Sequence, residues 1–415
     1  MRLLVATVTT LAALASPALA SADVITSWNR TFVDALEATQ TPPPVAHRSA
    51  AIVASSVFDA VNGVARRFTP VHVAPAAPHG ASRAAAAVAA AHESLVALFP
   101  NQKTMLDARY ADSQEELGSS PFVQRGLDWG THVADEILAW RANDGFTAVL
   151  PPYVASTLPG RWQPTPPAFG PPLFRQFAEM TPFALASPGQ FPLPGPPPLT
   201  SARYARDLNE VEALGRSNSS VRTATETETM KFWQLDTPAA MWDRVADDLA
   251  EQRSWSLVRE ARMLALTNIA LADATIAVWN AKNAFDSWRP VTAIARADQD
   301  GNPETSADPS WSPLLATPQF QEYPSAHSGI SAAGAAALAS FYGEGAAFTV
   351  TSNGLPRAER SFSSFPAAVA QIADARIFAG FHFRFSCVDG IVLGNEIAQY
   401  IRSTHLLSVQ GGERP

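Results

Sequence analysis

The residues best suited to chemistry lie in three short segments of the C-terminal third of the chain. In the first, Arg289 follows Lys282 by seven residues and directly precedes Pro290. Seven residues make almost two helical turns, so both cations return to nearly the same face, roughly 10 Å apart along the axis. Two cations so placed can hold one oxyanion. For this segment alone, a solvated basic face near a helix end is the simpler interpretation.

The second segment begins at Tyr323 and continues into a helix of small residues that extends through residues 330–342. A proline near the first helical position and the free N–H groups of the first turn form a cradle for an anion. Ser325 adds a hydroxyl donor, and His327 can deliver or remove a proton. Taken alone, a Ser325 helix cap and a solvated His327 explain this segment more simply.

The third segment carries Arg376 and His382 on a helix predicted over residues 365–383. Six residues separate the two side chains, so they lie about 120° apart and converge only if Arg376 reaches across a turn. Gly380 leaves room for a close approach. By itself, a histidine among phenylalanines is more often a core residue than a ligand.

Together the three segments offer permanent cations, one helix N-terminus and two histidines. This set suits a tetrahedral oxyanion with one histidine bonded to its central atom and the other placed for proton transfer. The sequence contains no Gly-rich nucleotide loop, no paired-cysteine metal site, no His-Glu-x-x-His and no Gly-x-Ser-x-Gly motif. An oxyanion site is therefore the predicted centre of any catalysis.

These segments resemble the tripartite signature of the vanadium haloperoxidases and the phosphatidic acid phosphatase type 2 superfamily. That signature reads Lys-x6-Arg-Pro, then Pro-Ser-Gly-His, then Ser-Arg-x5-His-x3-Asp, and the order and separations agree. Residues 162–167, 222–233 and 288–294 also resemble the bacterial chloroperoxidase-like branch. The resemblance thus extends over most of the chain.

The resemblance implies that the cradle binds vanadate, with phosphate as a competing occupant. His382 would be the axial ligand to vanadium, His327 the acid–base residue and Phe320 the aromatic residue beside the halide. Vanadate would act as a Lewis acid that polarises hydrogen peroxide for attack by a halide, which then reacts with an organic acceptor. The expected contacts to the equatorial oxygens are Lys282, Arg289, Ser325, the backbone N–H of Ala326, and Arg376.

Three positions depart from the family pattern. Ala326 stands in place of glycine, Ala375 in place of serine, and Ser386 in place of the final aspartate. Ala326 keeps the backbone N–H but adds a methyl group beside the oxyanion. These changes keep open a third function, a non-catalytic protein that binds an oxyanion.

Carboxylate partners are expected for both histidines, because an acidic group orients a ligand imidazole. Asp389 is the expected partner of His382, since Ser386 has no carboxylate. Glu226 or Glu228 is the expected partner of His327.

Two enzymatic functions follow from the resemblance. As a haloperoxidase, the protein would oxidise a halide with hydrogen peroxide. As a phosphomonoesterase, it would hydrolyse a phosphoester, with His382 attacking phosphorus and His327 protonating the leaving alcohol. The long helical N-terminal half and the Pro-rich segment favour the haloperoxidase, because the soluble phosphatases of the superfamily are much shorter.

The elements that position these residues are predicted to be helices, so the fold class is all-α, with two helical bundles. Apolar residues recur at three- and four-residue spacing along most of the chain. Residues 151–198 hold 15 of the 34 prolines together with several aromatics, which predicts an ordered, packed loop. The expected regions are an N-terminal helical region (21–145), the Pro-rich loop (146–201) and a C-terminal helical domain (202–415). Helices are predicted at 23–38, 48–62, 82–99, 102–117, 122–143, 202–215, 222–235, 256–282, 365–383 and 388–405, with one strand at 347–351.

Composition narrows the location and the partners. Residues 1–20 have the basic end, short apolar core and small-residue cleavage site of a signal peptide, which predicts a secreted or periplasmic protein. No later segment has about 20 uninterrupted apolar residues, so no membrane span is expected. The net charge of -8 argues against nucleic acid as a partner. With one cysteine, Cys387, the chain forms no internal disulfide.

Overall fold

The computed structural model describes residues 23–234 and 236–409. Within these residues there are 13 α-helices and one two-stranded sheet, which confirms the all-α prediction. The expected signal peptide, residues 1–20, lies outside the described residues. So does Leu235, the last residue of the helix predicted at 222–235.

All five helices predicted in the N-terminal half are present. Ser82 caps the third by accepting a hydrogen bond from the backbone N–H of Ala85 at 3.3 Å. The second, third and fifth helices pack closely, and a Cβ atom at Gly130 would lie 2.3 Å from the carbonyl oxygen of Ala86. The bounds are α1 (Asp23–Thr39), α2 (Pro43–Ala65), α3 (Arg83–Leu98), α4 (Lys103–Leu117) and α5 (Pro121–Arg141), with the 3-10 helix η1 (Pro100–Gln102) before α4.

The Pro-rich loop is ordered and packed, as predicted. It contains the short 3-10 helix η2 (Arg175–Glu179), and Trp162 and Phe177 within it are buried. The Asp273 carboxylate accepts three backbone N–H bonds, of 2.7 to 2.9 Å, from consecutive loop residues 183–185. The loop is therefore anchored to the helical core and is not a flexible linker.

The C-terminal half contains eight helices and a β-hairpin. Helices α8 and α10 and the second strand were not predicted from the sequence. The strands β1 (Phe348–Thr351) and β2 (Glu359–Phe362) pair antiparallel, with Phe348 opposite Phe362. The helices are α6 (Ala202–Gly215), α7 (Ala224–Gln234), α8 (Pro238–Glu251), α9 (Leu257–Phe285), α10 (Pro290–Ala295), α11 (Ala326–Tyr342), α12 (Phe365–Phe378) and α13 (Arg384–Thr404), with the 3-10 helix η3 (Ala297–Gln299) after α10.

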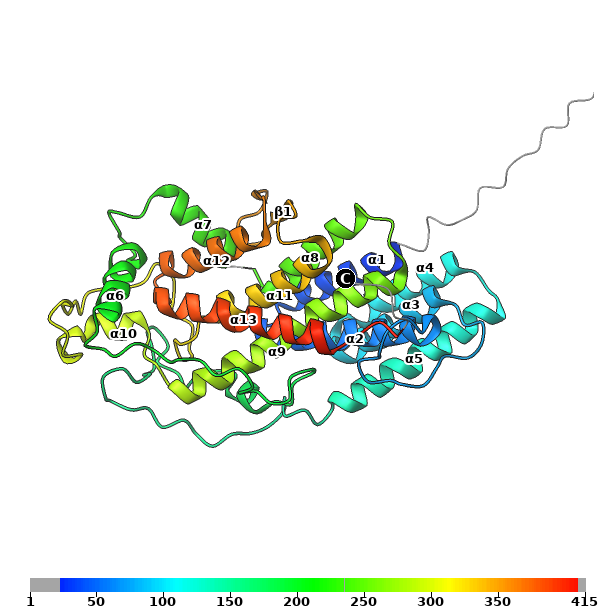
Figure 1. Cartoon of the computed structure of the whole chain (residues 1–415), viewed down its shortest axis with the longest axis horizontal. Coiled ribbons are helices and arrows are strands. Elements are labelled where there is room, and N and C mark those ends of the chain that lie inside the picture. Colours follow the sequence, from blue (N-terminus) through cyan, green and yellow to red (C-terminus); the bar gives the residue numbers. More distant parts are fainter. Residues whose placement is uncertain (1–22, 235, 410–415) are drawn as a thin grey trace, which may run out of the picture.

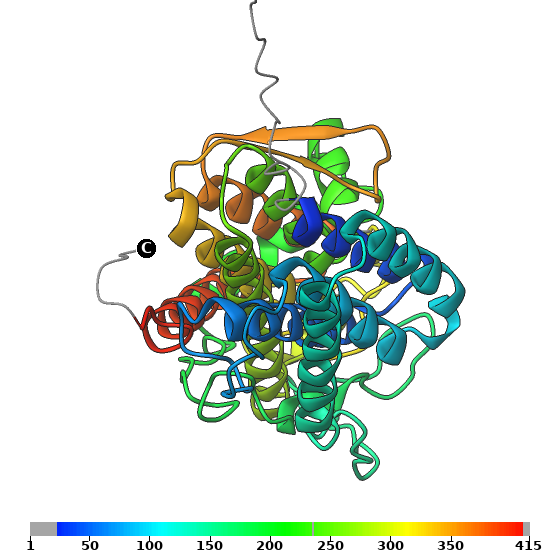
Figure 2. The same cartoon turned by 90° about the vertical axis from the view of Figure 1, so that its right-hand side faces the viewer.

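Helix α9 is the central element of the molecule. It packs against α2 on one side and against α11 and α13 on the other, and it runs lengthwise between the N-terminal helices and α6 and α10 (Figure 1). The end-on view shows the other helices grouped around it, with the hairpin across the top (Figure 2). Among the described residues, α9 is the one helix long and apolar enough to cross a membrane, but almost all of it is buried. It is therefore the core helix of the bundle.

Helices α11 and α13 make the close contact that brings two of the predicted segments together. A Cβ atom at Gly394 would lie 2.0 Å from the carbonyl oxygen of Gly329, so the two backbones meet without side chains between them. At the start of the pair, the backbone N–H of Ser325 donates to the carbonyl of Ser386 at 3.1 Å. The N-terminus of α11 is thereby held beside the first turn of α13.

The helix predicted at 365–383 is shorter than expected. Helix α12 ends at Phe378, residues 379–383 form a turn, and α13 begins at Arg384. Gly380 has φ +80°, in the left-handed region that favours glycine, and a Cβ atom there would lie 2.8 Å from the carbonyl oxygen of Gly215. His382 therefore lies in a turn and not on a helix.

Candidate active site

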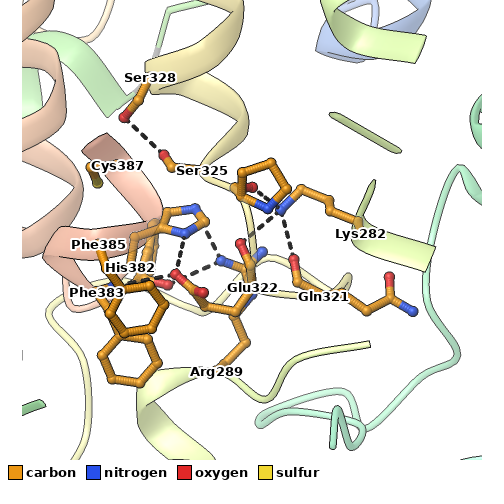
Figure 3. Close-up of polar contacts among 12 residues, drawn as sticks. Lys282, Arg289, Gln321, Glu322, Ser325, Ser328, His382, Phe383, Phe385 and Cys387 are labelled. Carbon is orange, nitrogen blue, oxygen red and sulfur yellow. Dashed lines mark hydrogen bonds and ion pairs between the residues drawn. The ribbon is translucent and has the colours of Figure 1, made fainter. Parts of the chain in front are cut away.

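The three predicted segments meet at one buried site (Figure 3). Lys282 comes from the last turn of α9, Arg289 and Ser325 are the N-caps of α10 and α11, and Arg376 is on α12. His382 enters from the turn before α13. All five side chains are at most 2% exposed, so the site excludes bulk water from its polar groups.

The Lys282 ammonium contacts backbone carbonyls. Its Nζ atom donates to the carbonyl oxygens of Gln321, Glu322 and Pro324 at 2.7, 2.9 and 2.7 Å. Three acceptors require three N–H protons, so the side chain is held in its charged form even though burial, and then the nearby Arg289, lower its pKa. Lys282 thus fixes the backbone that leads into Ser325, and its predicted contact with a vanadate oxygen stays a prediction.

Arg289 is partly satisfied by the same backbone. Its Nε donates to the carbonyl of Phe320 at 2.7 Å and its Nη1 to the carbonyl of Phe381 at 3.0 Å, while Nη2 is buried with no partner. Burial lowers the pKa of Arg289 to about 9, against the opposite effect of Glu322. The Phe320 ring lies 4.9 Å from the guanidinium carbon, so it packs over this cation.

Arg376 lies near His382, whose pKa its charge lowers, because the chain turns between them. The backbone N–H of Phe381 donates to the carbonyl of Arg376 at 3.1 Å, which folds the turn back onto the end of α12. The Arg376 guanidinium donates from Nη1 to the side-chain oxygen of Gln234, and its Nε is buried with no partner. The 120° separation expected on an ideal helix therefore does not apply.

His382 is held between an acceptor and a donor. Its Nδ1 lies 2.8 Å from Oε1 of Glu322, and its Nε2 lies 3.2 Å from Nη1 of Arg289. Because arginine can only donate, Nε2 must carry the lone pair and Nδ1 the proton. Burial, followed by the charges of Arg289 and Lys282, lowers the pKa of His382 well below its usual value, so the ring is neutral.

The predicted carboxylate partner of His382 was wrong. Asp389 instead accepts a hydrogen bond from the Tyr323 hydroxyl at 2.8 Å and lies 3.7 Å from the Arg203 guanidinium. It sits one helical turn beyond the start of α13 and faces these groups. The partner of His382 is Glu322, which the sequence analysis did not single out.

The predicted acidic partners of His327 were also wrong. Glu226 accepts hydrogen bonds from the backbone N–H and the hydroxyl of Thr223, at 2.7 and 3.0 Å, and forms the capping box of α7. Glu228 is exposed on the same helix. The groups whose charge acts on His327 are Arg376, His47, Lys282 and Arg289.

His327 lies in the first turn of α11 and is half-buried, with a buried Nε2 that has no partner. Burial and then the Arg376 charge lower its pKa well below the usual value, so the imidazole is neutral and can accept a proton. Beside it, the Ser325 hydroxyl lies 2.9 Å from that of Ser328, and although Ser325 occupies the N-cap position, its side chain makes no capping hydrogen bond to α11. The first-turn N–H groups of α11 have no partners within the helix.

The charges of the site do not balance. Lys282, Arg289 and Arg376 are buried cations, while Glu322 is the one carboxylate whose charge acts on Lys282 or Arg289 among the residues the structure describes. Uncompensated buried charge is costly. Donors on Arg289 and Arg376 also lack acceptors. An anion with several oxygens would correct both deficits.

Comparisons with known proteins agree with this chemistry. Residues 262–411 match the family model described as the VCPO second helical-bundle domain. Vanadium chloroperoxidase from Curvularia inaequalis is 29% identical over an alignment of 152 residues. The match covers 31% of this chain but only 24% of that protein. A solved structure described as the first bacterial vanadium-dependent iodoperoxidase superimposes with a TM-score of 0.81 at 26% identity, covering 94% of this chain and 98% of that one. This chain is a vanadium haloperoxidase-like protein.

A second solved structure, a holo-type bacterial vanadium-dependent chloroperoxidase, shares the fold of this haloperoxidase-like chain. Its TM-score is 0.71 at 18% identity, with 87% of this chain and 91% of that chain covered. The described residues contain no group of three or more His, Cys, Asp or Glu side chains that could hold a metal ion. A single neutral histidine among cations is a donor set that fits vanadate, an oxyanion, and not a bare metal cation.

Glu322 is the functional residue that local sequence reasoning missed in this haloperoxidase-like chain. It precedes Tyr323 in a segment where the neighbouring Ser325 and His327 match the motif, and nothing in its spacing marks it. Its side chain is fully buried, and burial raises its pKa to about 7. The sequence offers only an indirect signal for it. A buried histidine that ligates through one ring nitrogen needs a hydrogen-bond acceptor for the N–H of the second ring nitrogen.

Proposed function

We propose that this protein is a vanadium-dependent haloperoxidase that uses hydrogen peroxide to oxidise a halide at a vanadate bound to His382. The observation that carries the proposal is the buried excess of positive charge around a neutral histidine whose Nε2 lone pair faces the cations. Arg289 Nη2 and Arg376 Nε supply unpartnered donors on the same site. The named relatives, all vanadium haloperoxidases, support the same assignment.

The chain's own residues would bind and orient the anion. His382 would offer its Nε2 lone pair to the metal, and Arg289 and Arg376 would donate hydrogen bonds to the oxygens. Ser325 adds a hydroxyl, and the backbone N–H of Ala326 belongs to the positive end of α11. Bound vanadate would supply a Lewis-acidic centre that makes hydrogen peroxide electrophilic. The surrounding cations strengthen that effect, because the site is buried and screening by water is weak.

Proton transfer is assigned to His327. Oxidation of a halide to hypohalous acid transfers two electrons to hydrogen peroxide, releases water and consumes one proton. A neutral His327 can take a proton from the incoming peroxide and return it to the leaving oxygen. Phe320, whose ring covers Lys282 and Arg289, forms an apolar wall suited to a weakly hydrated halide.

The test begins with protein purified in phosphate-free buffer and reconstituted with orthovanadate. Iodide and bromide oxidation by hydrogen peroxide are measured beside hydrolysis of an aryl phosphate. Halide oxidation that depends on vanadate, and that is lost in His382→Ala, is the expected result. His132→Ala, which removes an exposed histidine on α5, is the matched control and should retain activity.

The other functions give different outcomes in the same assay. Phosphate-ester hydrolysis without halide oxidation would identify a phosphomonoesterase that uses His382 as a nucleophile. Vanadate binding with neither activity would identify an oxyanion-binding protein. Halide oxidation that persists in His382→Ala would contradict the role given to that residue.

We also propose that the enzyme is exported, because residues 1–20 have the pattern of a signal peptide. Expression of the full chain in a secreting bacterial host should release protein whose mature end lies near Ser21. Mass spectrometry of the released protein measures that end. An intact N-terminus on soluble intracellular protein would contradict export.

A further inference from the structure

We propose that Glu322 is the positioning residue of this site, which selects the tautomer of His382 and holds its ring toward the oxyanion. The inference deepens the proposed function, on which it rests for the identity of the anion. Glu322 lies in none of the three motifs that the sequence shares with the haloperoxidases. Its position in the structure nevertheless joins all three.

The contacts of Glu322 connect the three segments. Its Oε1 accepts from Nδ1 of His382 at 2.8 Å and from the backbone N–H of Phe383 at 3.1 Å. Its carbonyl oxygen accepts from Nζ of Lys282 at 2.9 Å, and its backbone N–H donates to the carbonyl of Ser287 at 3.0 Å. Figure 3 shows the Glu322 carboxylate beside the His382 ring, joined to it by a dashed line. One residue therefore sets the relative positions of the turn, the last turn of α9 and the segment before α11.

The hydrogen bond to Nδ1 determines which ring nitrogen is free to ligate. With the Nδ1 proton held by Glu322, the lone pair must lie on Nε2, where it faces Arg289 at 3.2 Å. The opposite tautomer would place an Nε2 proton against a guanidinium proton and remove the imidazole donor from the carboxylate, leaving it only the backbone N–H of Phe383. Without the Oε1 acceptor, the ring loses both its preferred tautomer and its fixed orientation.

Neighbouring groups do not duplicate this role. Asp389 is engaged by Tyr323 and Arg203. Ser386, in the first turn of α13, lies near enough to the Glu322 carboxylate to affect its pKa, but its hydroxyl makes no hydrogen bond and it carries no negative charge. A carboxylate introduced at position 386 would therefore lie next to the place where the Glu322 carboxylate is removed.

Vanadate affinity measures this role independently of turnover. Equilibrium dialysis against orthovanadate gives the Kd of the unmodified protein and of Glu322→Ala, Glu322→Gln and the double variant Glu322→Ala with Ser386→Asp. We expect Glu322→Ala to weaken binding about 10- to 100-fold, as loss of the group behind a metal-ligating histidine usually does. Glu322→Gln keeps an acceptor oxygen and should lose less, and the double variant should recover most of the affinity.

Asp389→Asn is the matched control, because it also removes a buried carboxylate next to the site. Its vanadate Kd should stay near that of the unmodified protein. Circular dichroism and thermal unfolding of every variant separate loss of the site from loss of the fold. Equal weakening in Asp389→Asn and Glu322→Ala, or no recovery in the double variant, would overturn the assignment.

A second measurement needs no vanadate and separates this inference from the proposed function. Spectra of protein labelled with 15N-histidine, with His382 assigned by its loss in His382→Asn, report which ring nitrogen is protonated. The expected signal is a protonated Nδ1 in the unmodified protein and a mixture of tautomers in Glu322→Ala. An unchanged tautomer in that variant would refute the role of Glu322, even if the protein proved to be a phosphatase.

Discussion

The Nη1 atom of Arg289 lies 3.2 Å from the Nε2 atom of His382, so a guanidinium proton occupies the lone pair expected to bind vanadium. The same Nη1 atom also donates to the carbonyl of Phe381 at 3.0 Å, and Nε donates to that of Phe320. An oxyanion that binds here can therefore accept the hydrogen bond that Nη1 otherwise donates to His382. The contacts to the backbone carbonyls keep the guanidinium in place. Arg289 therefore keeps the Nε2 lone pair of His382 unprotonated and also presents a hydrogen-bond donor to the anion.

Arg289→Lys should weaken vanadate binding about 10- to 100-fold, because one ammonium cannot hold two carbonyls and still present a further donor. Isothermal titration calorimetry with orthovanadate measures the change. Arg30→Lys, at a surface pair with Glu251, is the control and should bind like the unmodified protein. Equal affinity in Arg289→Lys and the control would show that Arg289 does not contact the anion.

Lys282→Met should loosen the segment that carries Ser325. The change leaves the carbonyls of Gln321, Glu322 and Pro324 without their donor, and each unsatisfied buried acceptor costs about 1–3 kcal/mol. Urea unfolding should show a lower free energy of unfolding, and hydrogen exchange should be faster at residues 321–328. Lys103→Met, which removes an exposed lysine on α4, should change neither quantity. Unchanged exchange in Lys282→Met would mean that other contacts hold the segment.

Gly394→Ala should separate α11 from α13. The added methyl group would lie 2.0 Å from the Gly329 carbonyl, and overpacking of this kind costs about 1–3 kcal/mol. A lower midpoint in thermal unfolding is expected, together with weaker vanadate binding, because the N-terminus of α11 would shift. Gly345→Ala has open space around the new Cβ and serves as the control. A normal midpoint in Gly394→Ala would contradict the close packing.

The contribution of Asp243 to stability should fall as pH rises from about 4 to about 7. Burial raises the pKa of this carboxyl from 3.8 to about 7, against the opposite effect of Asn268. Because the folded pKa is the higher one, the stabilisation is complete below the unfolded pKa and is lost as pH rises through 7. Between the two pKa values the free energy of unfolding should fall by about 1.4 kcal/mol for each pH unit. Asp243→Asn should flatten this dependence when the free energy of unfolding is measured by urea titration at both ends of that pH range. An unchanged slope would show that Asp243 ionises normally.

Orthovanadate should raise the unfolding temperature by mass action. A ligand at 100 times its Kd adds about 2.7 kcal/mol to the stability of the folded state. Differential scanning calorimetry should record the shift, and phosphate should compete for it. Arg376→Gln should lose most of the shift, because it removes a buried cation with an unpartnered Nε. A shift of the same size in that variant would place the anion elsewhere.

The sequence by itself determined most of the helices and the three segments of the site. Helices show in the periodicity of apolar residues, and the motifs show in the spacing of residues close together in the chain. Both can therefore be predicted from the sequence alone. Four residues of the predicted set accordingly meet at one site, namely Lys282, Arg289, Ser325 and His382. The fifth, Arg376, is buried and close enough for its charge to lower the pKa of Lys282, Arg289 and His382. Helices α8 and α10, the second strand and the turn at 379–383 were not predicted.

Only the tertiary structure decided which hydrogen-bond partners the side chains of the site have. The choice of Glu322 over Asp389 as the partner of His382 depends on which carboxylate is buried beside the ring, and that follows from the packing of elements 60 residues apart in sequence. The commitment of all three Lys282 protons to backbone carbonyls has the same origin. Sequence spacing reports which residues can share a face, whereas hydrogen-bond partners are chosen when distant segments are desolvated together.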